Sequence, residues 1–489
     1  MEQELRRLPD GTYTGAMTDE HICGIFGCCG DWNRREVRIG ALTVYVYAID
    51  GITSGGDASE YVVKPLMQDA FGGTMDELYD RALHRTVYNS VAVPCGDLQS
   101  TAEKLVNGFT VVLFGQRAIA FETKTGEKRS PSAPEVENTV KGPKDAFTET
   151  VRTNTSLLRR HLRTPALRLY ETVVGRRSLT NVTLAWIDGL TEPALVQRMQ
   201  ARLAEIDIDG LLTPAAVEEY LTGSRPTAFP LLQYTERTDR FAQALLEGRV
   251  GLLVDGLPLG YLAPVDLGYL MTSAEDRGTD FVSASFLRVL RYAALLLGLL
   301  LPGLYVAMAA FHPQMLPTEL LQSILESKRA VPFPTIVEVL GLLAAFELLQ
   351  EASVSLPQSV GQSLSIIGGL VVGSAAVEAR LISPAALIVV AAAGICGFAI
   401  PGRSFADALR VWRMALAAAA SLAGLFGLTL GAICLVVHLA GLDSFGISYL
   451  APFSGVGGAR ALLRPRLVRE PLRDPLLRPL DRRNQGGKR

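Results

Sequence analysis

The chain has 489 residues, enough for two or three domains of about 100 to 200 residues each. Its 47 basic and 49 acidic side chains give a formal charge of −2 and a pI near 6.3, which excludes the strongly positive field of a nucleic-acid-binding protein. Hydrophobic residues make up 49% of the chain, and charged residues become sparse after Arg291, so a soluble N-terminal half is expected to precede a membrane-embedded half.

Residues 1–29 are expected to form a flexible N-terminal segment. They begin with MEQELRRLPDGTY, which contains acidic residues and no apolar core, so this start is not a cleaved signal peptide. His21, Cys23, Cys28 and Cys29 could be imagined as metal ligands, but they lack a second CxxC or HxxxH motif. We therefore expect a glycine-rich entry segment with reduced thiols, and neither a metal nor a cofactor.

The rest of the soluble half contains two pairs of similar stretches. Val44–Ile52 and Val182–Leu190 are both alternating apolar segments that include Ile-Asp-Gly. Gly108–Ala120 and Gly248–Gly260 both predict a β-hairpin. In each pair the second stretch follows the first at nearly the same offset along the chain, so we infer a duplicated, cytoplasmic α/β unit. Its subdomains are expected at residues 30–170 and 171–285.

No catalytic motif stands out, and the chain is not expected to be an enzyme. It has no GxxxxGK[ST] phosphate loop, no HExxH metal motif and no GxSxG nucleophile motif. Asp50 and Asp188 could be polar site residues, but an aspartate before glycine at the end of a strand usually forms a turn.

The second half predicts a polytopic bundle of transmembrane helices over residues 286–455. Uncharged runs long enough to cross about 30 Å of hydrocarbon occur at residues 292–311, 360–377, 381–400 and 414–441. These four runs are the expected spans.

The segment Val331–Glu351 is ambiguous, because its apolar pattern carries Glu338, Glu347 and Glu351. A charged side chain at the centre of a bilayer costs about 2.5 to 3.5 kcal/mol, so these carboxylates should face protein, water or headgroups. One interpretation is a re-entrant or pore-adjacent helix whose carboxylates select cations. The other is an amphipathic surface helix or an ordinary fifth span. The sequence leaves both open.

A stripe of mostly small side chains runs along the second apolar run. Its members are Gly361, Ser365, Gly369, Val372 and Ala376, which share one face at helical spacing. Helices in lipid pack closely through such residues. The stripe therefore suits either tight helix packing or the wall of a narrow pore.

Basic residues near the span ends give conflicting indications of orientation. Arg403, Arg410 and Arg413 precede the last run, and a basic, proline-rich tail covers residues 456–489, so both should be cytoplasmic and the tail solvated. A single span would separate the two, unless Leu442–Ser454 folds back into the membrane. Whether the number of spans is even or odd stays open.

Longer motifs run through both halves of the chain. They are Thr235-Glu236-Arg237-Thr238-Asp239, Leu245–Val250, Asp255–Pro258, Gly142-Pro143, Phe147–Glu149, Asn154, Leu158–Arg160, Val331–Gly373 and His438–Pro452. In these motifs the chain, from Phe26 to Pro452, resembles the GerA family of bacterial spore germination proteins, specifically the A subunits of germinant receptors. Thr238, Ser355 and Arg380 stand where that family usually has proline, arginine and glycine.

The resemblance implies a multi-pass subunit in the lipid of the spore inner membrane. It implies a homo-oligomeric ring, expected to be a pentamer, that forms a nutrient-gated cation channel with a B-type ligand-binding membrane subunit and a C-type lipoprotein. The stripe would line the pore, and the three glutamates would select cations. A SpoVAF-type paralogue and a non-conducting scaffold remain alternatives. The motif residues expected to be structural or to form interfaces are Asn154, Arg159, Thr235, Glu236, Arg237, Asp239, Gly248, Arg249, Asp255 and Gly256.

Overall fold

The computed structural model describes residues 4–8, 11–68, 73–125, 134–135, 137, 141–223, 226–355, 373–454, 462–464, 466 and 472–484. The chain divides into two compact units. Unit 1 comprises Met1–Arg225, Leu232–Pro264 and Val468–Arg489, and unit 2 comprises Pro226–Leu231 and Val265–Leu467. The chain therefore passes between the units four times.

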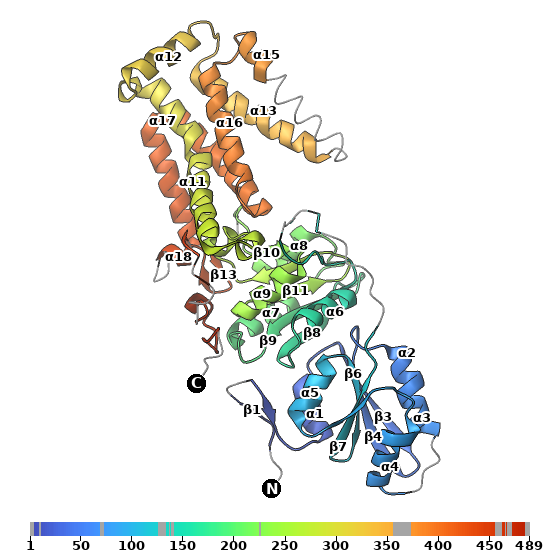
Figure 1. Ribbon diagram of the computed structural model, residues 1–489. Helices are drawn as coiled ribbons and strands as arrows, with labels where there is room; N and C mark the ends of the chain where they lie inside the picture. The colour runs from blue at the N-terminus through green and yellow to red at the C-terminus, as the bar shows by residue number, and fades with distance from the viewer. Residues whose placement is uncertain are drawn as a thin grey trace. The chain divides into compact units, whose positions relative to one another are not determined.

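Unit 1 contains two five-stranded antiparallel sheets with the same topology (Figure 1). The first consists of β3 (Trp32–Ile39), β4 (Leu42–Ile49), β5 (Ala92–Cys95), β6 (Phe109–Phe114) and β7 (Arg117–Glu122). The second consists of β8 (Leu167–Val174), β9 (Thr180–Ile187), β10 (Gln233–Thr235), β11 (Val250–Val254) and β12 (Gly260–Ala263). The orders are β3-β4-β6-β7-β5 and β8-β9-β11-β12-β10, so in both sheets the third strand in sequence lies at an edge, beside the fifth.

The similar stretches of sequence correspond to equivalent strands of these sheets. The two Ile-Asp-Gly segments overlap β4 and β9, and the two hairpin segments overlap the β6–β7 and β11–β12 pairs. The second sheet begins at Leu167, so β8 crosses the boundary that was predicted between residues 170 and 171.

Helices cover both faces of the first sheet (Figure 1). On one face, α1 (Asp19–Phe26) and α5 (Leu98–Val106) contribute to the core, and on the other α3 (Lys64–Gln68) and α4 (Met75–Arg81) do so. The segment predicted to be flexible therefore includes a capped helix. The Thr18 hydroxyl accepts a hydrogen bond from His21 N, and Ile22 is 1% exposed.

The second sheet is associated with α6 (Val151–His161), α7 (Pro193–Ala204), α8 (Pro214–Thr222) and α9 (Thr238–Glu247). Helix α9 ends at Gly248, whose φ of 105° is the left-handed conformation that favours glycine.

The described residues 472–484 of the predicted solvated tail are mostly exposed, but they are anchored to unit 1 by several contacts. Arg473 Nε donates to Leu246 O at 2.9 Å, and Leu480 N donates to Leu190 O at 2.9 Å. The side chain of Leu477 is buried. Both ends of the chain thus belong to one folded unit.

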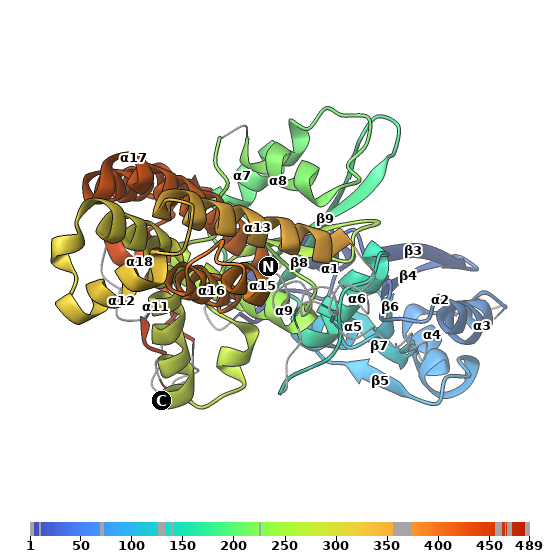
Figure 2. The same ribbon diagram turned by 90° about the horizontal axis from the view of Figure 1, so that it is seen from above.

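Unit 2 is helical. Its principal helices are α11 (Phe281–Val306), which continues as a π-helical turn (Ala307–Phe311), α12 (Thr318–Lys328), α13 (Thr335–Ser355), α15 (Gly373–Glu378), α16 (Pro384–Phe398) and α17 (Arg403–Gly441). Figures 1 and 2 show α11 beside α16 and α17.

Two helices in the described part of the chain are long and apolar enough to cross a membrane, and they span Phe281–Phe311 and Arg403–Gly441. The apolar helix α16 is shorter, with 15 residues. The predicted span at residues 360–377 lies mostly outside the described residues. Within the described residues, two helices thus meet the length and composition of a membrane span, and the predicted span at residues 360–377 stays untested.

Helix α17 is a hairpin rather than a straight rod. Its backbone leaves the helical region at Ala423 and at Gly424, where φ is 59° and ψ is −138°. The rings of Trp412 and His438 lie 5.6 Å apart, although a straight helix between these two positions would separate them by about 39 Å. A Cβ on Gly431 would likewise lie 2.7 Å from the Leu416 side chain. The helix therefore turns back on itself.

The hairpin corrects the prediction of one continuous helix over residues 414–441. Its arms are Arg403–Leu422 and Leu425–Gly441, on either side of the two non-helical residues. Because the arms are antiparallel, Arg403 and Gly441 lie at the same end, the open end of the hairpin. The following segment forms a short β-hairpin, β13 (Asp443–Ser444) with β14 (Ile447–Ser448), and α18 (Ala451–Ser454).

Arg380, at the position where glycine was expected, adopts a left-handed conformation with φ of 56°. It follows α15, and Leu381 N closes the helix end by donating to Ala376 O at 2.9 Å. An L-residue in this region costs about 1 to 2 kcal/mol, so Arg380→Gly is expected to raise stability by about 1 kcal/mol. Thermal unfolding of the detergent-solubilised protein measures the gain. An unchanged or lower midpoint would contradict it.

Candidate functional site

The polar contacts between α13, α16 and α17 form the most unusual group in unit 2. Charged side chains in otherwise apolar helices are rare and usually functional, since lipid cannot solvate them. Glu338, Glu347 and Glu351, the three predicted site residues on α13, therefore decide what the site can do.

Glu338 is buried and joins two helix N-termini. Its side chain is 3% exposed, and the Ser383 hydroxyl donates to its Oε2 at 2.7 Å. The same Ser383 caps α16 by accepting a hydrogen bond from Ala386 N at 3.4 Å. Glu338 itself lies in the first turn of α13, so the dipoles of both helices stabilise its negative charge. Its Oε1 has no hydrogen-bond partner among the residues that the structure describes.

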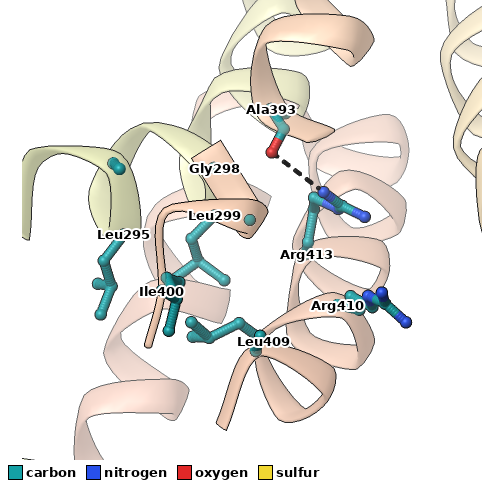
Figure 3. A pocket seen from close by; sticks show the side chains of 11 residues that line it. Leu295, Gly298, Leu299, Ala393, Ile400, Leu409, Arg410 and Arg413 are labelled. Atoms are coloured by element: carbon teal, nitrogen blue, oxygen red, sulfur yellow. Dashed lines mark hydrogen bonds between the residues drawn. The ribbon is translucent and has the colours of Figure 1, made fainter. Parts of the chain in front are cut away.

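Glu347 is ion-paired with an arginine of the α17 hairpin. The guanidinium of Arg413 donates to Glu347 Oε1, and Arg410 Nε lies 3.8 Å from the other carboxylate oxygen. Arg413 also donates to Ala393 O of α16 at 3.3 Å (Figure 3). The side chain of Arg413 is 6% exposed. One buried guanidinium therefore holds α13, α16 and α17 together.

A small hollow lies beside this ion pair, between α11, α16 and α17 (Figure 3). Small residues create it, with Gly298, Ala393 and Gly397 among them. Arg410 and Arg413 also line it, but both guanidiniums already pair with carboxylates. The hollow thus combines an apolar wall with charges that are largely compensated.

The remaining predicted residues of the membrane half are not brought into this group. Glu351 is exposed near the end of α13, and Ala376 lies in α15. The other four members of the stripe lie outside the described residues, and they are Gly361, Ser365, Gly369 and Val372. Sequence reasoning missed Arg413 and Ser383, although an arginine pair spaced by three positions next to an apolar run was a visible signal.

In unit 1, Arg237 fixes the segment before α9. It is 2% exposed and donates to both carboxylate oxygens of Asp239, at 3.0 and 2.8 Å, and to Pro143 O at 3.1 Å. Thr235 donates to the carboxylate of Glu137. These contacts hold the loop before α6 against the start of α9.

The start of α6 is held by Asn154, within the helix, and by the turn between β11 and β12. Asn154 Oδ1 accepts from Thr148 N at 2.8 Å, and its amide donates to Thr148 O at 2.6 Å. Asp255 accepts from Val151 N at 2.9 Å, and Gly256, with φ of 86°, donates to Glu149 O at 2.7 Å. The hairpin turn of the second sheet therefore caps α6.

Arg159 connects the two subdomains. Its fully buried guanidinium donates to both carboxylate oxygens of Asp31, at 2.8 and 3.0 Å, and to Leu167 O at 3.1 Å. Glu236 accepts a hydrogen bond from Phe147 N through its carbonyl oxygen, and Arg249 donates to Pro264 O. The motif residues of unit 1 thus organise its backbone.

Both aspartates of the Ile-Asp-Gly turns pair with arginines. Asp50 lies 3.2 Å from Arg152, and Asp188 lies 3.1 Å from Arg168 and 3.4 Å from Arg7. Among the residues that the structure describes, no group of three or more His, Cys, Asp or Glu side chains could hold a metal ion.

The sequence profile described as the Bacillus/Clostridium GerA spore germination protein matches residues 20–480, nearly the whole chain. The chain belongs to the GerA family. It is 35% identical to the spore germination protein KA of Bacillus subtilis over 452 residues, which cover 90% of this chain and 82% of that protein. It is 33% identical to the spore germination protein A1 of the same organism, covering 86% of each.

Two further matches concern a membrane protein and a solved structure. An uncharacterized membrane protein of Bacillus subtilis, YfkQ, is 35% identical over 87% of this chain and 83% of its own length. The N-terminal domain of the A subunit of the Bacillus megaterium spore germinant receptor GerK3 aligns with 54% of this GerA-family chain and 97% of its own, at 26% identity. Its TM-score of 0.40 is too low to establish a shared fold.

Thr238, at the position where the GerA family usually has proline, is the first residue of α9, where proline would also fit the backbone. Its hydroxyl instead donates to Asp145 O at 3.3 Å and lies 3.0 Å from His161 Nε2. His161 Nε2 lies 2.6 Å from Asp145 Oδ2. The Thr238 hydroxyl thus contacts both members of the His161–Asp145 ion pair and links the start of α9 to the end of α6.

This pair predicts a pH dependence of stability. The hydrogen bond to Asp145 raises the pKa of His161 above 6.5, and the same bond lowers the pKa of Asp145 from 3.8 to about 2. The stability that protonated His161 contributes is complete below pH 6.5 and is lost as the pH rises through the pKa of His161 in the folded protein. The stability that ionised Asp145 contributes is present above pH 3.8 and is lost as the pH falls toward 2. The destabilisation by His161→Gln should therefore be larger at pH 5.5 than at pH 8.5 when thermal unfolding is compared. Equal destabilisation at both would contradict the ion pair.

Proposed function

We propose that this GerA-family chain is the membrane subunit of a spore germinant receptor and that it oligomerises into a nutrient-gated cation channel. The observation that supports this best is the Glu347–Arg413 pair within apolar helices. A helix that only anchors a protein in lipid has no use for charged side chains, each of which costs about 2.5 to 3.5 kcal/mol at the bilayer centre on insertion scales. Their presence favours a membrane part that does more than anchor.

The pore in this proposal is lined by the stripe that includes Val372 and Ala376, close after α13 in the chain. Because Glu338 and Glu347 already bind neighbouring helices, we assign them to holding α13 in place. Glu351 is exposed and lies nearest in sequence to the stripe, so it is the carboxylate assigned to cation preference.

The topology in this proposal is multi-pass, with both chain ends on the cytoplasmic side of the spore inner membrane. Leu472–Asn484 packs on unit 1, so the chain must return to the side from which it left at Val265. This supports an even number of crossings. The two arms of α17 contribute a pair of them.

The partners in this proposal are further copies of the chain, arranged in a ring with a pentamer as the expected size, a B-type ligand-binding subunit and a C-type lipoprotein. A nutrient bound to the B-type subunit can open the ring only if it binds the open state more tightly than the closed state. Cations would then leave the spore core.

A non-conducting scaffold is the second candidate, and one observation favours it: Glu338 and Glu347 are already engaged by protein groups. Reconstitution of the chain with its partner subunits in potassium-loaded liposomes separates the two. The channel predicts potassium release on addition of nutrient. Intact vesicles that retain potassium with every partner present would support the scaffold.

Glu351→Gln tests the assigned selectivity residue. Loss of an exposed carboxylate near a cation pathway should lower the permeability for potassium relative to chloride, because the local potential becomes less negative. Reversal potentials in reconstituted bilayers measure the ratio. Glu319→Gln, on the short helix α12, is the matched control. An unchanged ratio in Glu351→Gln would contradict the assignment.

A further inference from the structure

The segment Pro226–Leu231 is a short insertion of the chain into unit 2. It follows α8 and precedes β10, which both belong to unit 1, and the chain returns to unit 1 at Leu232. This segment thus leaves the α/β fold, packs among the helices of unit 2 and comes back.

Phe229 carries most of this packing, at the open end of the α17 hairpin. Its side chain is 2% exposed. On the first arm its ring lies 5.8 Å from that of Phe405 and 6.5 Å from that of Trp412. On the second arm it lies 6.1 Å from the ring of His438, and it also lies 6.1 Å from that of Tyr449, just beyond this arm. Phe229 therefore contacts both arms at once.

Hydrogen bonds hold the segment at each end of Phe229. The Thr227 hydroxyl lies 2.9 Å from His438 Nε2 and accepts from Phe229 N at 3.1 Å. Leu231 O accepts from the Ser444 hydroxyl at 2.7 Å. The insertion is therefore fixed to the second arm and to β13.

Ser444 also binds the segment that follows β12, where the chain passes from unit 1 to unit 2. Its hydroxyl oxygen accepts from Val265 N at 3.0 Å, and Ser444 is 1% exposed. Leu231 closely precedes β10, Val265 closely follows β12, and these two strands pair with each other. One buried hydroxyl therefore joins the two places where the paired strands continue into unit 2.

We propose that Phe229 is a wedge that sets the separation of the two α17 arms, and that Thr227 and Ser444 are the positioning residues that hold it. Only Leu232 lies between the segment and β10, so the chain links the wedge closely to this strand. The effect on germination rests on the proposed channel function, but the wedge itself does not.

The distance between the arms tests the wedge directly. Spin labels are placed at Val411→Cys and Val437→Cys, two exposed positions on opposite arms, in full-length protein whose native cysteines are replaced. Phe229→Ala is expected to shift and broaden the distribution of distances between the labels. Phe286→Ala, which removes an exposed phenylalanine from α11, is the matched control and should leave the distribution unchanged. A distribution in Phe229→Ala equal to that of the control would overturn the proposal.

A milder pair of variants covers the case in which Phe229→Ala does not fold. Thr227→Val keeps the shape but loses the bond to His438, and Thr227→Ser keeps the hydroxyl. The broadened distribution should appear in the valine variant and be absent in the serine variant. Identical distributions in both would overturn the positioning role.

Potassium release from liposomes separates failure of the wedge from failure of the channel. Release on addition of nutrient in the parent protein, together with unchanged arm distances in Phe229→Ala, overturns the wedge and leaves the channel standing. Altered arm distances in Phe229→Ala, with no release in any preparation, support the wedge and refute the channel.

Discussion

Replacement of Arg413 by alanine is expected to destabilise unit 2 strongly. It removes the closer of the two arginines beside Glu347 and the hydrogen bond to Ala393 O. Breaking a buried ion pair costs about 3 to 5 kcal/mol, and we expect the lower end because the Glu347 side chain is 27% exposed. Thermal unfolding in detergent, with the amount of protein recovered from the membrane, measures this loss.

A double-mutant comparison isolates the pair. In the Glu347→Gln background no carboxylate is left without a partner, so Arg413→Ala should be less harmful there than in the parent chain. Arg403→Ala, at the exposed start of the same arm, is the control and should change the unfolding midpoint little. If Arg413→Ala behaved like Arg403→Ala, the ion pair would have no structural role.

Gly424→Ala is expected to prevent the α17 hairpin from closing. Its φ of 59° and ψ of −138° suit glycine, and a non-glycine residue held there costs about 1 to 3 kcal/mol. The added Cβ would also lie 2.9 Å from Phe311 Cβ and 3.0 Å from His312 Cε1. Since overpacking adds about 1 to 3 kcal/mol, the protein should accumulate poorly in the membrane, as quantified by immunoblotting.

A second glycine of the same helix serves as the control. A Cβ on Gly441 would meet no heavy atom within 4 Å, so Gly441→Ala should accumulate normally. Normal accumulation and unfolding of Gly424→Ala would show that α17 does not require the turn.

The α/β fold was largely readable from the sequence. The alternating apolar strands and the Ile-Asp-Gly turns occur twice, and both pairs of similar stretches are separated by nearly the same number of residues. The two copies correspond to equivalent strands of the two sheets. The boundary at residue 170 was misplaced because β8 is an edge strand with partly exposed positions, so its apolar pattern is weak.

The turn of α17 left almost no trace in the sequence. Ala423 and Gly424 lie in a run without charge or proline, and alanine and glycine are ordinary in helices that pack in lipid. The run was therefore interpreted as one long, tilted span. Contacts in the folded chain, such as those between Trp412 and His438 and between Leu416 and Gly431, reveal the fold-back.

The candidate site was predicted in part. The three glutamates were recognised by their position in an apolar segment, but their partners Ser383 and Arg413 come from other helices, far away in the sequence, which periodicity cannot pair. The docking of the C-terminal residues was missed because backbone hydrogen bonds such as that of Leu480 N need no particular residue type. A basic, proline-rich composition then suggests solvent exposure.

The most direct test of the membrane hairpin is sided cysteine labelling in intact membrane vesicles. Single cysteines are introduced at Arg403, at Gly441 and at Leu422, which is 85% exposed beside the turn. The hairpin predicts that Arg403→Cys and Gly441→Cys react with an impermeant reagent from the same side, and Leu422→Cys from the opposite side. Reaction of Arg403→Cys and Gly441→Cys from opposite sides would show a single span and contradict both the hairpin and the even number of crossings.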